Sequence, residues 1–276
     1  MSVRFRAAFA LLASALCFGS ANGQRTKEPV PFVLGVSERI QSYALNEERV
    51  LNVYLPLGYA ADTAGAYPVI YLLDGSADED FIHVSGAVQF ASYPWITWVQ
   101  PSIVVGIANV DRKRDLTFPT SVAKDKEQFP TTGGSAAFMR FIGDELIPFI
   151  DGNYRTGPDR MLIGQSLGGL FATEVLFERP ELFTRYLIVS PSLWWDDGSL
   201  LKLAPAFAAD RASVPQSVFI AVGKEGKGMV GPAKQLAALV RKQPGIRVGY
   251  KYLPEFDHAN PLHRAVMEGF RWMGEK

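Results

Sequence analysis

The residues best suited to chemistry form the run Gly164-Gln165-Ser166-Leu167-Gly168. This G-x-S-x-G pattern is typical of a nucleophile elbow, a strained turn between a strand and a helix that projects a serine hydroxyl. Side chains at Gly164 and Gly168 are expected to collide with neighbouring backbone in such a turn. An apolar run at 161–163 precedes the motif and a helical pattern follows it. This context favours a catalytic Ser166 over an ordinary glycine-rich turn.

A serine hydroxyl is a weak nucleophile and needs a base within hydrogen-bond reach. The chain contains 3 histidines. His83 lies in a helical pattern ahead of the motif, and His263 lies inside the last amphipathic segment. His258 follows the last strand-like run in a polar turn, and it fits the chain order of nucleophile, acid and histidine that accompanies this motif. We therefore predict His258 as the general base.

The acid that orients the histidine must be a carboxylate between Ser166 and His258. Glu225 follows the penultimate strand-like run, so it is our candidate. Asp196 and Asp197 follow the preceding run and are its rivals. Asp257 adjoins the histidine and is expected to face away from the site.

An oxyanion hole requires two backbone N–H donors. The residue after the nucleophile, Leu167, should supply one donor. The second is expected from the loop after the apolar run at 71–73, at Gly75 or Ser76. An ordinary Asp-Gly turn is the alternative interpretation of that loop.

The elements that position these residues follow from apolar periodicity. Near-alternation at 32–43 and 50–55 predicts an antiparallel pair at one edge of a sheet. Continuous apolar runs predict strands buried on both faces, and they lie at 69–73, 102–108, 160–163, 186–189, 217–222 and 247–253.

Helical patterns separate most of these runs. Apolar residues recur on one face at 136–150 and again at 262–273. Pro148 falls inside the first pattern, so a bend or an end is expected there. The predicted architecture is a mostly parallel α/β sheet with helices on both faces, whose active site lies at the carboxyl ends of the strands.

Bulk composition excludes some classes of function. The 276 residues carry 28 Lys plus Arg and 28 Asp plus Glu, so the formal net charge is zero. No strong field exists to attract nucleic acid or an anionic membrane, and we expect no nucleic-acid partner. The length suits one α/β domain, predicted here over residues 24–276.

The first 23 residues are interpreted as a signal peptide. Arg4 and Arg6 precede an apolar run at 7–18, and small residues follow it. The run is shorter than the roughly 20 residues needed to span a bilayer, so no stable membrane span is expected. Cys17 lies within this run, and its flanking residues fit a lipoprotein signal poorly. Export with a cysteine-free mature chain is therefore predicted.

Together these motifs resemble a bacterial esterase family that includes the trilactone siderophore esterases, the enterochelin and salmochelin hydrolases. The matching segments span nearly the whole predicted mature chain, in the order Tyr71-Leu72-Leu73-Asp74-Gly75, Val105-Gly106-Ile107, Asp111-Arg112-Lys113-Arg114-Asp115-Leu116-Thr117, Gly164-Gln165-Ser166-Leu167-Gly168-Gly169, Ser190-Pro191-Ser192-Leu193-Trp194-Trp195 and His258. The resemblance implies an α/β-hydrolase fold and hydrolysis of a small-molecule ester without a cofactor or metal. In siderophore hydrolases the Ser–His pair is sometimes described as a dyad, which leaves a role for Glu225 open.

The resemblance also assigns roles to residues outside the motif. Trp194 and Trp195 could line an acyl or aryl pocket, although at least one could instead pack in the core. Arg112 and Arg114 could bind an anionic or carbonyl-rich substrate. Equally, the two arginines could only hold their loop to Asp115.

Two other functions would share these residues. A secreted acyltransferase would carry the same elbow and histidine, but would pass the acyl group to an alcohol instead of water. A non-catalytic binding protein on the same frame is the second alternative. Such proteins usually lose the serine or the histidine, whereas this chain has both in order.

Overall fold

The computed structural model describes residues 27–209 and 216–275. The predicted signal peptide at 1–23, with Cys17, lies outside these described residues. Residues Leu34–Lys276 form one compact unit, separate from Met1–Val33. The elements described below all belong to the Leu34–Lys276 unit.

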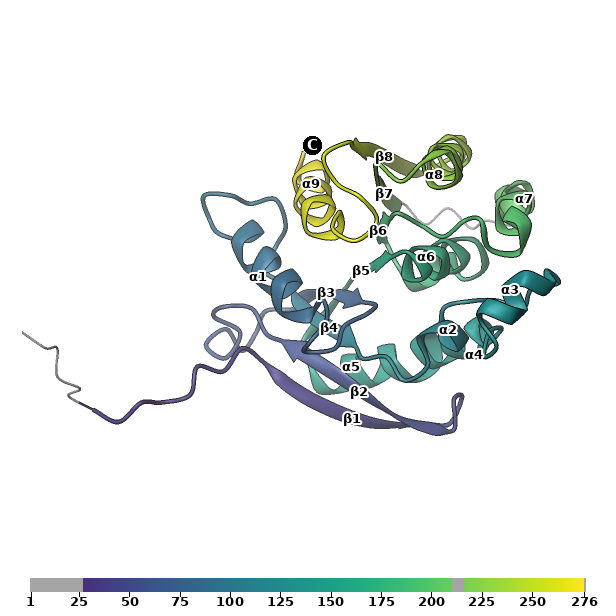
Figure 1. Ribbon diagram of the computed structural model, residues 1–276. Coiled ribbons are helices and arrows are strands. Elements are labelled where there is room, and N and C mark those ends of the chain that lie inside the picture. The colour runs from purple at the N-terminus through teal and green to yellow at the C-terminus, as the bar shows by residue number, and fades with distance from the viewer. Residues whose placement is uncertain (1–26, 210–215, 276) are drawn as a thin grey trace, which may run out of the picture. The chain divides into compact units, whose positions relative to one another are not determined.

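A mixed sheet runs through this unit (Figure 1), and its strands among the described residues have the order β1-β2-β4-β3-β5-β6-β7-β8. Strand β1 pairs antiparallel with β2, and β2 pairs antiparallel with β4. All other neighbours pair parallel. The predicted mostly parallel sheet with an antiparallel N-terminal edge is thus confirmed. The strands are β1 (Val36–Ser42), β2 (Glu47–Tyr54), β3 (Tyr67–Leu72), β4 (Ile103–Ile107), β5 (Thr156–Gln165), β6 (Arg185–Val189), β7 (Gln216–Gly223) and β8 (Ile246–Leu253).

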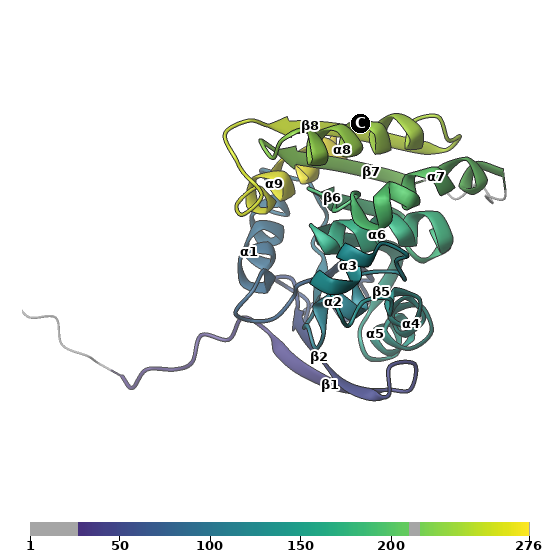
Figure 2. The same ribbon diagram turned by 45° about the vertical axis from the view of Figure 1, so that its right-hand side comes forward.

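Helices cover both faces of the sheet, as Figures 1 and 2 show. One face packs against α1 and α9, and the other packs against α6, α8 and the helical segment that includes α4 and α5. The described helices are α1 (Phe81–Ala91), α2 (Arg112–Asp115), α3 (Ala123–Gln128), α4 (Ser135–Arg140), a π-helix (Phe141–Leu146), α5 (Ile147–Asn153), α6 (Leu167–Glu178), a 3-10 turn (Pro180–Leu182), α7 (Trp195–Ala209), α8 (Lys227–Val240) and α9 (Leu262–Gly274).

The central strands contain continuous apolar runs because both of their faces are buried over those residues. In β3, Val69 and Tyr71 face one core while Ile70 and Leu72 face the other. Successive side chains on a strand point to opposite faces, so each strand supplies both layers. This packing fixes which strand ends meet at the site.

The predicted helix at 136–150 differs from the structure. The segment is composite, with α4, the π-helix and α5 in succession, and it continues past Pro148 to Asn153. Pro148 lies in the first turn of α5, where a missing N–H costs little. The wider π turn just before it thus lets the chain accommodate a proline that we expected to end or bend the helix.

Among the described residues, no helix is both long enough and apolar enough to cross a bilayer. The longest described helix without a break, α8, spans 14 residues, since α7 is interrupted by a kink at residues 196–198.

Candidate active site

Ser166 lies between the end of β5 and the start of α6. Its φ of 60° and ψ of −117° are unusual for a residue with a side chain. Such a backbone costs free energy and occurs where the surrounding structure holds it in place. Here the Ser166 N–H donates to the Val189 carbonyl of β6 at 3.0 Å, and the Ser166 carbonyl accepts from the Leu170 N–H at 2.9 Å. The strained turn aims the serine hydroxyl out of the sheet.

Close packing explains two glycines of this turn, but not the pair we predicted. A methyl group on Gly164 would lie 2.4 Å from the Gly168 carbonyl oxygen, so a side chain is excluded there. At Gly168 the nearest atoms would be 3.5 Å away, which is ordinary contact. The expected collision at Gly168 is therefore wrong. Gly169 is the tighter position, because its methyl would lie 2.9 Å from the Val189 carbonyl oxygen.

Ser166, His258 and Glu225 form one chain of hydrogen bonds. The Ser166 hydroxyl oxygen lies 2.9 Å from His258 Nε2. The other ring nitrogen, Nδ1, lies 2.5 Å from Glu225 Oε2. The three side chains come from the ends of β5, β7 and the loop after β8. Parallel strands place their carboxyl ends at one edge of a sheet, which explains how residues so distant in sequence meet.

Glu225 is held rigidly from its own strand end. Its Oε1 accepts from the Gly223 N–H at 2.9 Å and from the Ser190 hydroxyl. The carboxylate is buried, with 3% of its side chain exposed, whereas 47% of the His258 side chain is exposed. One carboxylate oxygen is thus committed to the scaffold and the other to the histidine.

The other carboxylates considered for the acid, Asp196, Asp197 and Asp257, contact groups other than the histidine ring. Asp196 Oδ1 accepts from Thr120 Oγ1 at 2.9 Å and from the Ser121 N–H at 2.8 Å. Asp257 lines the pocket at the serine, so the expectation that it faces away is wrong, but its Oδ1 accepts from the Ala259 N–H at 2.9 Å within its own turn. The backbone of Asp197 has a φ of 53°, and its carbonyl contacts the Lys202 ammonium. None of these described contacts joins a rival carboxylate to the histidine.

Three further residues at the site were missed from the sequence. The Ser192 hydroxyl lies 3.3 Å from that of Ser166, and the Ser192 N–H donates to the Ser166 carbonyl at 3.0 Å. The Gln165 side chain donates to the His258 carbonyl at 2.7 Å, tying the elbow to the histidine loop. Ser190 holds Glu225. Their position after the strand run at 186–189 was a usable signal for Ser190 and Ser192.

The candidate oxyanion donors differ in how their N–H groups are engaged. The Gly75 N–H donates to the Ile107 carbonyl at 3.0 Å, so it is committed to the backbone of β4. The Ser76 N–H lies 3.3 Å from Glu79 Oε2, a long contact. Leu167 begins α6, and the first N–H groups of a helix have no partner within it. Both N–H groups of the loop thus have an acceptor, and the contact of Ser76 is the longer of the two.

A pocket of about 550 Å³ opens above the serine. Trp194 lines it, with 38% of the residue exposed, beside Phe129 at a ring-centroid distance of 6.0 Å. Trp195 is fully buried and donates its indole N–H to the Phe118 carbonyl at 2.9 Å, so it packs in the core. The lining residues are Arg112, Phe129, Ser166, Leu167, Ser192, Trp194, Lys224, Glu225, Met229, Asp257 and His258.

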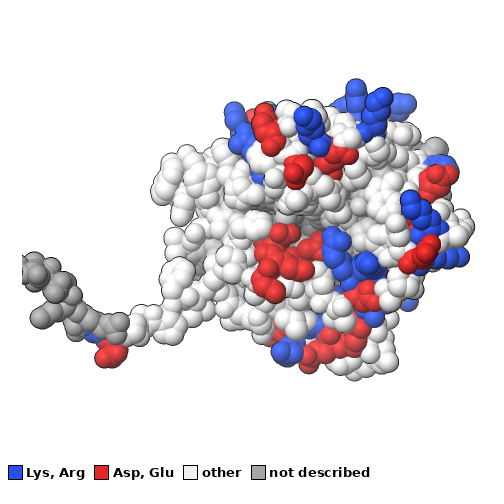
Figure 3. All heavy atoms as spheres, in the orientation of Figure 1, with Lys and Arg blue, Asp and Glu red and all other residues white. Residues whose placement is uncertain are grey.

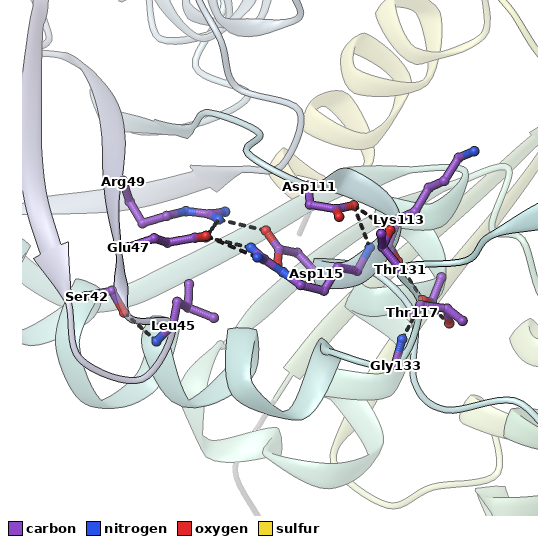
Figure 4. Close-up of polar contacts among 12 residues, drawn as sticks. Ser42, Leu45, Glu47, Arg49, Asp111, Lys113, Asp115, Thr117, Thr131 and Gly133 are labelled. Carbon is purple, nitrogen blue, oxygen red and sulfur yellow. Dashed lines mark hydrogen bonds and ion pairs between the residues drawn. The ribbon is translucent and has the colours of Figure 1, made fainter. Parts of the chain in front are cut away.

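The two predicted arginines have different surroundings. Arg112 lines the pocket and makes a bidentate ion pair with Asp74, at 2.6 Å and 2.8 Å. Arg114 does not line it. Its guanidinium pairs with Asp115 at 2.7 Å and with Glu47 at 2.6 Å. Figure 4 shows Glu47, Arg49 and Asp115 of this cluster. Of the two interpretations of Arg114, the loop-holding one fits these contacts.

Acidic groups gather around Arg112. Burial raises the pKa of Asp80 to about 6, and the nearby charges of Asp74 and Glu79 add to this effect. Burial lowers the pKa of Arg112, but the hydrogen bond and charge of Asp74 raise it above its ordinary value. Over residues 27–209 and 216–275, no group of three or more His, Cys, Asp or Glu side chains could hold a metal ion.

Comparisons with known proteins identify the family of the chain. A family model described as "Putative esterase" matches residues 42–259. Ferri-bacillibactin esterase BesA of Bacillus subtilis is 33% identical over 69% of this chain and 70% of its own length. A siderophore triacetylfusarinine C esterase of Aspergillus fumigatus is 31% identical, over 65% of this chain and 63% of its own length.

A solved structure extends the likeness to the fold. An IroE-like serine hydrolase from Shewanella oneidensis superposes with a TM-score of 0.77 and 33% identity, covering 86% of this chain and 79% of that one. The family match spans β2 through the histidine loop. The chain is therefore a member of this esterase family and has its α/β-hydrolase fold.

Proposed function

We propose that the protein is a serine carboxylic-ester hydrolase that acts through an acyl-enzyme on Ser166. The observation that carries this proposal is the hydrogen-bonded chain from the Ser166 hydroxyl through both ring nitrogens of His258 to Glu225. That order of contacts is what proton removal from a serine requires, because the base must touch the hydroxyl while the acid holds the far ring nitrogen.

In the acylation step, Ser166 Oγ attacks the carbonyl carbon of the ester and passes its proton to His258 Nε2. The carbonyl π pair moves to oxygen, and this oxyanion accepts hydrogen bonds from the N–H groups of Leu167 and Ser76. Collapse of the intermediate breaks the ester C–O bond. The leaving alkoxide takes the proton from His258 and departs as an alcohol, leaving the acyl group on the serine.

In the second step water replaces the serine as the nucleophile, and Ser166 becomes the leaving group. His258 takes a proton from the water, which attacks the acyl carbon, and Ser166 leaves with that proton as the free acid forms. Glu225 stabilises the imidazolium in both steps by its negative charge. Its burial and its bonds to Gly223 and Ser190 keep it in place without reorganisation.

The substrate is proposed to be a siderophore-like ester or another small ester. Two relatives carry siderophore esterase names, one for ferri-bacillibactin and one for triacetylfusarinine C. The pocket volume of about 550 Å³ lies within the range of small-molecule sites. Trp194 and Phe129 offer aromatic surface, and Lys224 offers positive charge.

The test is a kinetic panel on purified wild type and Ser166→Ala, using p-nitrophenyl esters and a trilactone. A triad nucleophile contributes on the order of 10⁶ in kcat, so the variant should be inactive while its circular dichroism is unchanged. More than about a tenth of the wild-type rate in Ser166→Ala, a loss of only ~1.4 kcal/mol, would exclude the mechanism. Adding an alcohol and analysing the products separates hydrolysis from acyl transfer.

A further inference from the structure

One guanidinium bridges the two loops that carry the candidate oxyanion donors. Arg112 Nε and Nη2 donate to the two carboxylate oxygens of Asp74, at 2.6 Å and 2.8 Å. The same Nη2 lies 3.3 Å from the carbonyl oxygen of Gln165. Asp74 is two residues before Ser76, and Gln165 is two residues before Leu167. The bridge therefore joins the segments that present both backbone donors.

The two bridged segments also lie against one another. A methyl group on Gly168, in the first turn of α6, would lie 3.5 Å from Asp74 Oδ2. The Leu73 N–H donates to the Ile163 carbonyl at 3.0 Å. A small rotation of the loop after β3 would thus move the Ser76 N–H relative to the elbow. Asp74 is the point at which such a rotation is resisted.

We propose that Arg112 is a positioning residue that sets the spacing of the two oxyanion donors by clamping Asp74 to the carbonyl of Gln165. This inference rests on the proposed serine mechanism. Charge-assisted bidentate pairs combine strength with fixed geometry, since two parallel N–H···O bonds define the orientation of both groups. A lysine would provide the charge without that geometry.

The loop needs such a clamp because its backbone is strained. Asp74 has a φ of 54°, in the left-handed region that residues with side chains rarely adopt. Its side chain is only 11% exposed, so the carboxylate requires partners. Asn109 supplies a further one, donating from Nδ2 to Asp74 Oδ1 at 2.8 Å and bonding to Glu79 as well. Loss of Arg112 would leave a half-satisfied carboxylate in a strained turn.

Arg112 is itself fixed from the other side of its helix. Asp111 caps α2 by accepting from the Arg114 N–H at 3.0 Å. At the end of α2, Asp115 pairs with Arg49 of β2 at 2.7 Å, and both side chains are 1% exposed. Figure 4 shows Arg49 and Asp115 meeting between the hairpin and the short helix. The buried pair of Arg49 and Asp115 therefore anchors to β2 the helix that carries Arg112.

The rival interpretation is that Arg112 binds an anionic substrate. The two roles separate on a neutral minimal ester such as p-nitrophenyl acetate, which offers no anion to bind. A positioning role predicts that Arg112→Met lowers kcat on this ester about 10- to 100-fold, because a displacement of the oxyanion donors by about 1 Å costs up to that factor in rate. KM should change less than about threefold, since the ester's ground-state contacts remain. Direct anion binding predicts no loss on this ester.

A second readout reports the oxyanion hole directly. Sulfur accepts hydrogen bonds weakly and forms a longer bond to carbon, so a thionoester gains little from donors placed for an oxyanion. The ratio of kcat/KM for the oxoester to that for the matched thionoester should fall at least about tenfold in Arg112→Met, given that one oxyanion donor contributes roughly 10²–10³. An unchanged ratio would overturn the inference.

Controls keep folding and mechanism apart. Arg179→Met removes an arginine of equal exposure, 35% against 34%, which also pairs with carboxylates, and it should leave the ratio unchanged. Asp74→Asn should lower the ratio as Arg112→Met does, and the double variant should lose no more than either single one. Arg112→Lys retains the charge, and its kcat should exceed that of Arg112→Met by less than about tenfold. A kcat equal to that of the wild type would show that the bidentate geometry is not needed.

Failure of this inference and failure of the proposed function are distinguishable. If the wild type shows serine-dependent turnover that Ser166→Ala abolishes, the proposed mechanism stands whatever Arg112 does. If Arg112→Met then retains the wild-type ratio and kcat, only the positioning role is wrong. Thermal melts of each variant show whether a loss of rate reflects unfolding instead. Should Arg112→Met unfold, the Asp74→Asn and Arg112→Lys ratios decide the question.

Discussion

At the scale of single residues, Glu225 differs from every rival carboxylate in what its two oxygens contact. Oε2 lies 2.5 Å from His258 Nδ1, and Oε1 is bound by Gly223 and Ser190. Asp196 Oδ1 instead accepts from Thr120 and Ser121. Among these carboxylates, the one placed to stabilise an imidazolium therefore follows β7, the strand that pairs with β8 ahead of the histidine loop.

Glu225→Gln should lower kcat on an activated ester by roughly 10⁴, because the amide cannot stabilise the charged ring and favours the wrong tautomer. Asp196→Asn and Asp197→Asn are matched controls with the same change of charge, and each should cost less than about tenfold. The measurement is kcat for all three variants on one ester. A loss carried by an aspartate would move the acid, and no loss above about tenfold would leave a Ser166–His258 pair acting alone.

Chain order was enough to predict that Ser166, His258 and Glu225 would meet in space. Ser166, His258 and Glu225 each follow a predicted strand, and the strand rule brings such positions together. It did not suffice for Ser190, Ser192 or Gln165, since their roles depend on which way a side chain turns across neighbouring strands. Likewise, pattern alone could not separate the exposed Trp194 from the buried Trp195, because the two are adjacent and equally apolar.

At the scale of secondary-structure elements, α6 carries a buried acid. Glu174 is 2% exposed and accepts from the Ser135 hydroxyl at 2.7 Å, which links α6 to the start of α4. Burial raises its pKa from 4.5 to about 8, the Ser135 hydrogen bond lowers it somewhat, and the charge of Glu178 raises it further. The folded protein therefore keeps a proton on Glu174 that the unfolded chain would lose near pH 4.5.

This shift predicts how stability depends on pH. Between pH 4.5 and about 8 the folded state binds more protons at Glu174 than the unfolded state, so the free energy of unfolding falls as pH rises through that window. Glu174→Gln should remove the dependence, being more stable than wild type at pH 9 but not at pH 4. Urea unfolding at both pH values measures it. Glu181→Gln, which changes an exposed residue in the 3-10 turn after α6, is the control. If the free energy of unfolding of wild type and of Glu174→Gln depended equally on pH, the raised pKa of Glu174 would be refuted.

The link between β2 and α2 is a second prediction at this scale. Arg49 and Asp115 are both 1% exposed and lie 2.7 Å apart, and without Asp115 the buried Arg49 retains Glu47, at 2.6 Å, as a carboxylate partner. Asp115→Ala should lower the free energy of unfolding by about 1.5–3 kcal/mol, the contribution of a hydrogen bond to a charged group. Glu48→Ala removes the partner of Arg39 in an exposed pair and should cost less than about 1 kcal/mol. A cost below about 1 kcal/mol for Asp115→Ala would show that this cluster does not hold the helix.

The sequence could predict that these elements exist, but not how some of them join. The pattern at 136–150 showed one apolar face, which the structure confirms as buried. It could not show the π turn at Phe141–Leu146, because periodicities of helical types differ too little over six residues. Nor could it show Arg49 reaching Asp115, since a buried ion pair depends on two segments 66 residues apart.

At the scale of the whole molecule, charge is balanced and mixed. Acidic and basic side chains are interspersed over much of the face in Figure 3, while the surface over α1 carries neither. Residues 81–110 indeed contain no Asp, Glu, Lys or Arg. Balanced charge gives little long-range steering, so the rate of substrate capture should depend only weakly on ionic strength.

Export is a further prediction at this scale. If residues 1–23 act as a signal peptide, the mature chain should begin between Asn22 and Thr26. Leu12→Arg should block export by interrupting the apolar run, whereas Lys27→Gln, beyond the run, should not. N-terminal sequencing of the exported protein checks both. Exported protein that still begins at Met1 would refute cleavage.

The central claim is that Ser166 becomes covalently acylated, and a fluorophosphonate probe tests it most directly. The serine oxygen displaces fluoride from phosphorus, giving a stable adduct that marks an activated nucleophile. Intact-mass and peptide measurements should show one adduct per chain, on the peptide containing Ser166, and none in Ser166→Ala. Labelling of another serine, above all Ser192 at 3.3 Å, or undiminished labelling of Ser166→Ala, would contradict the account.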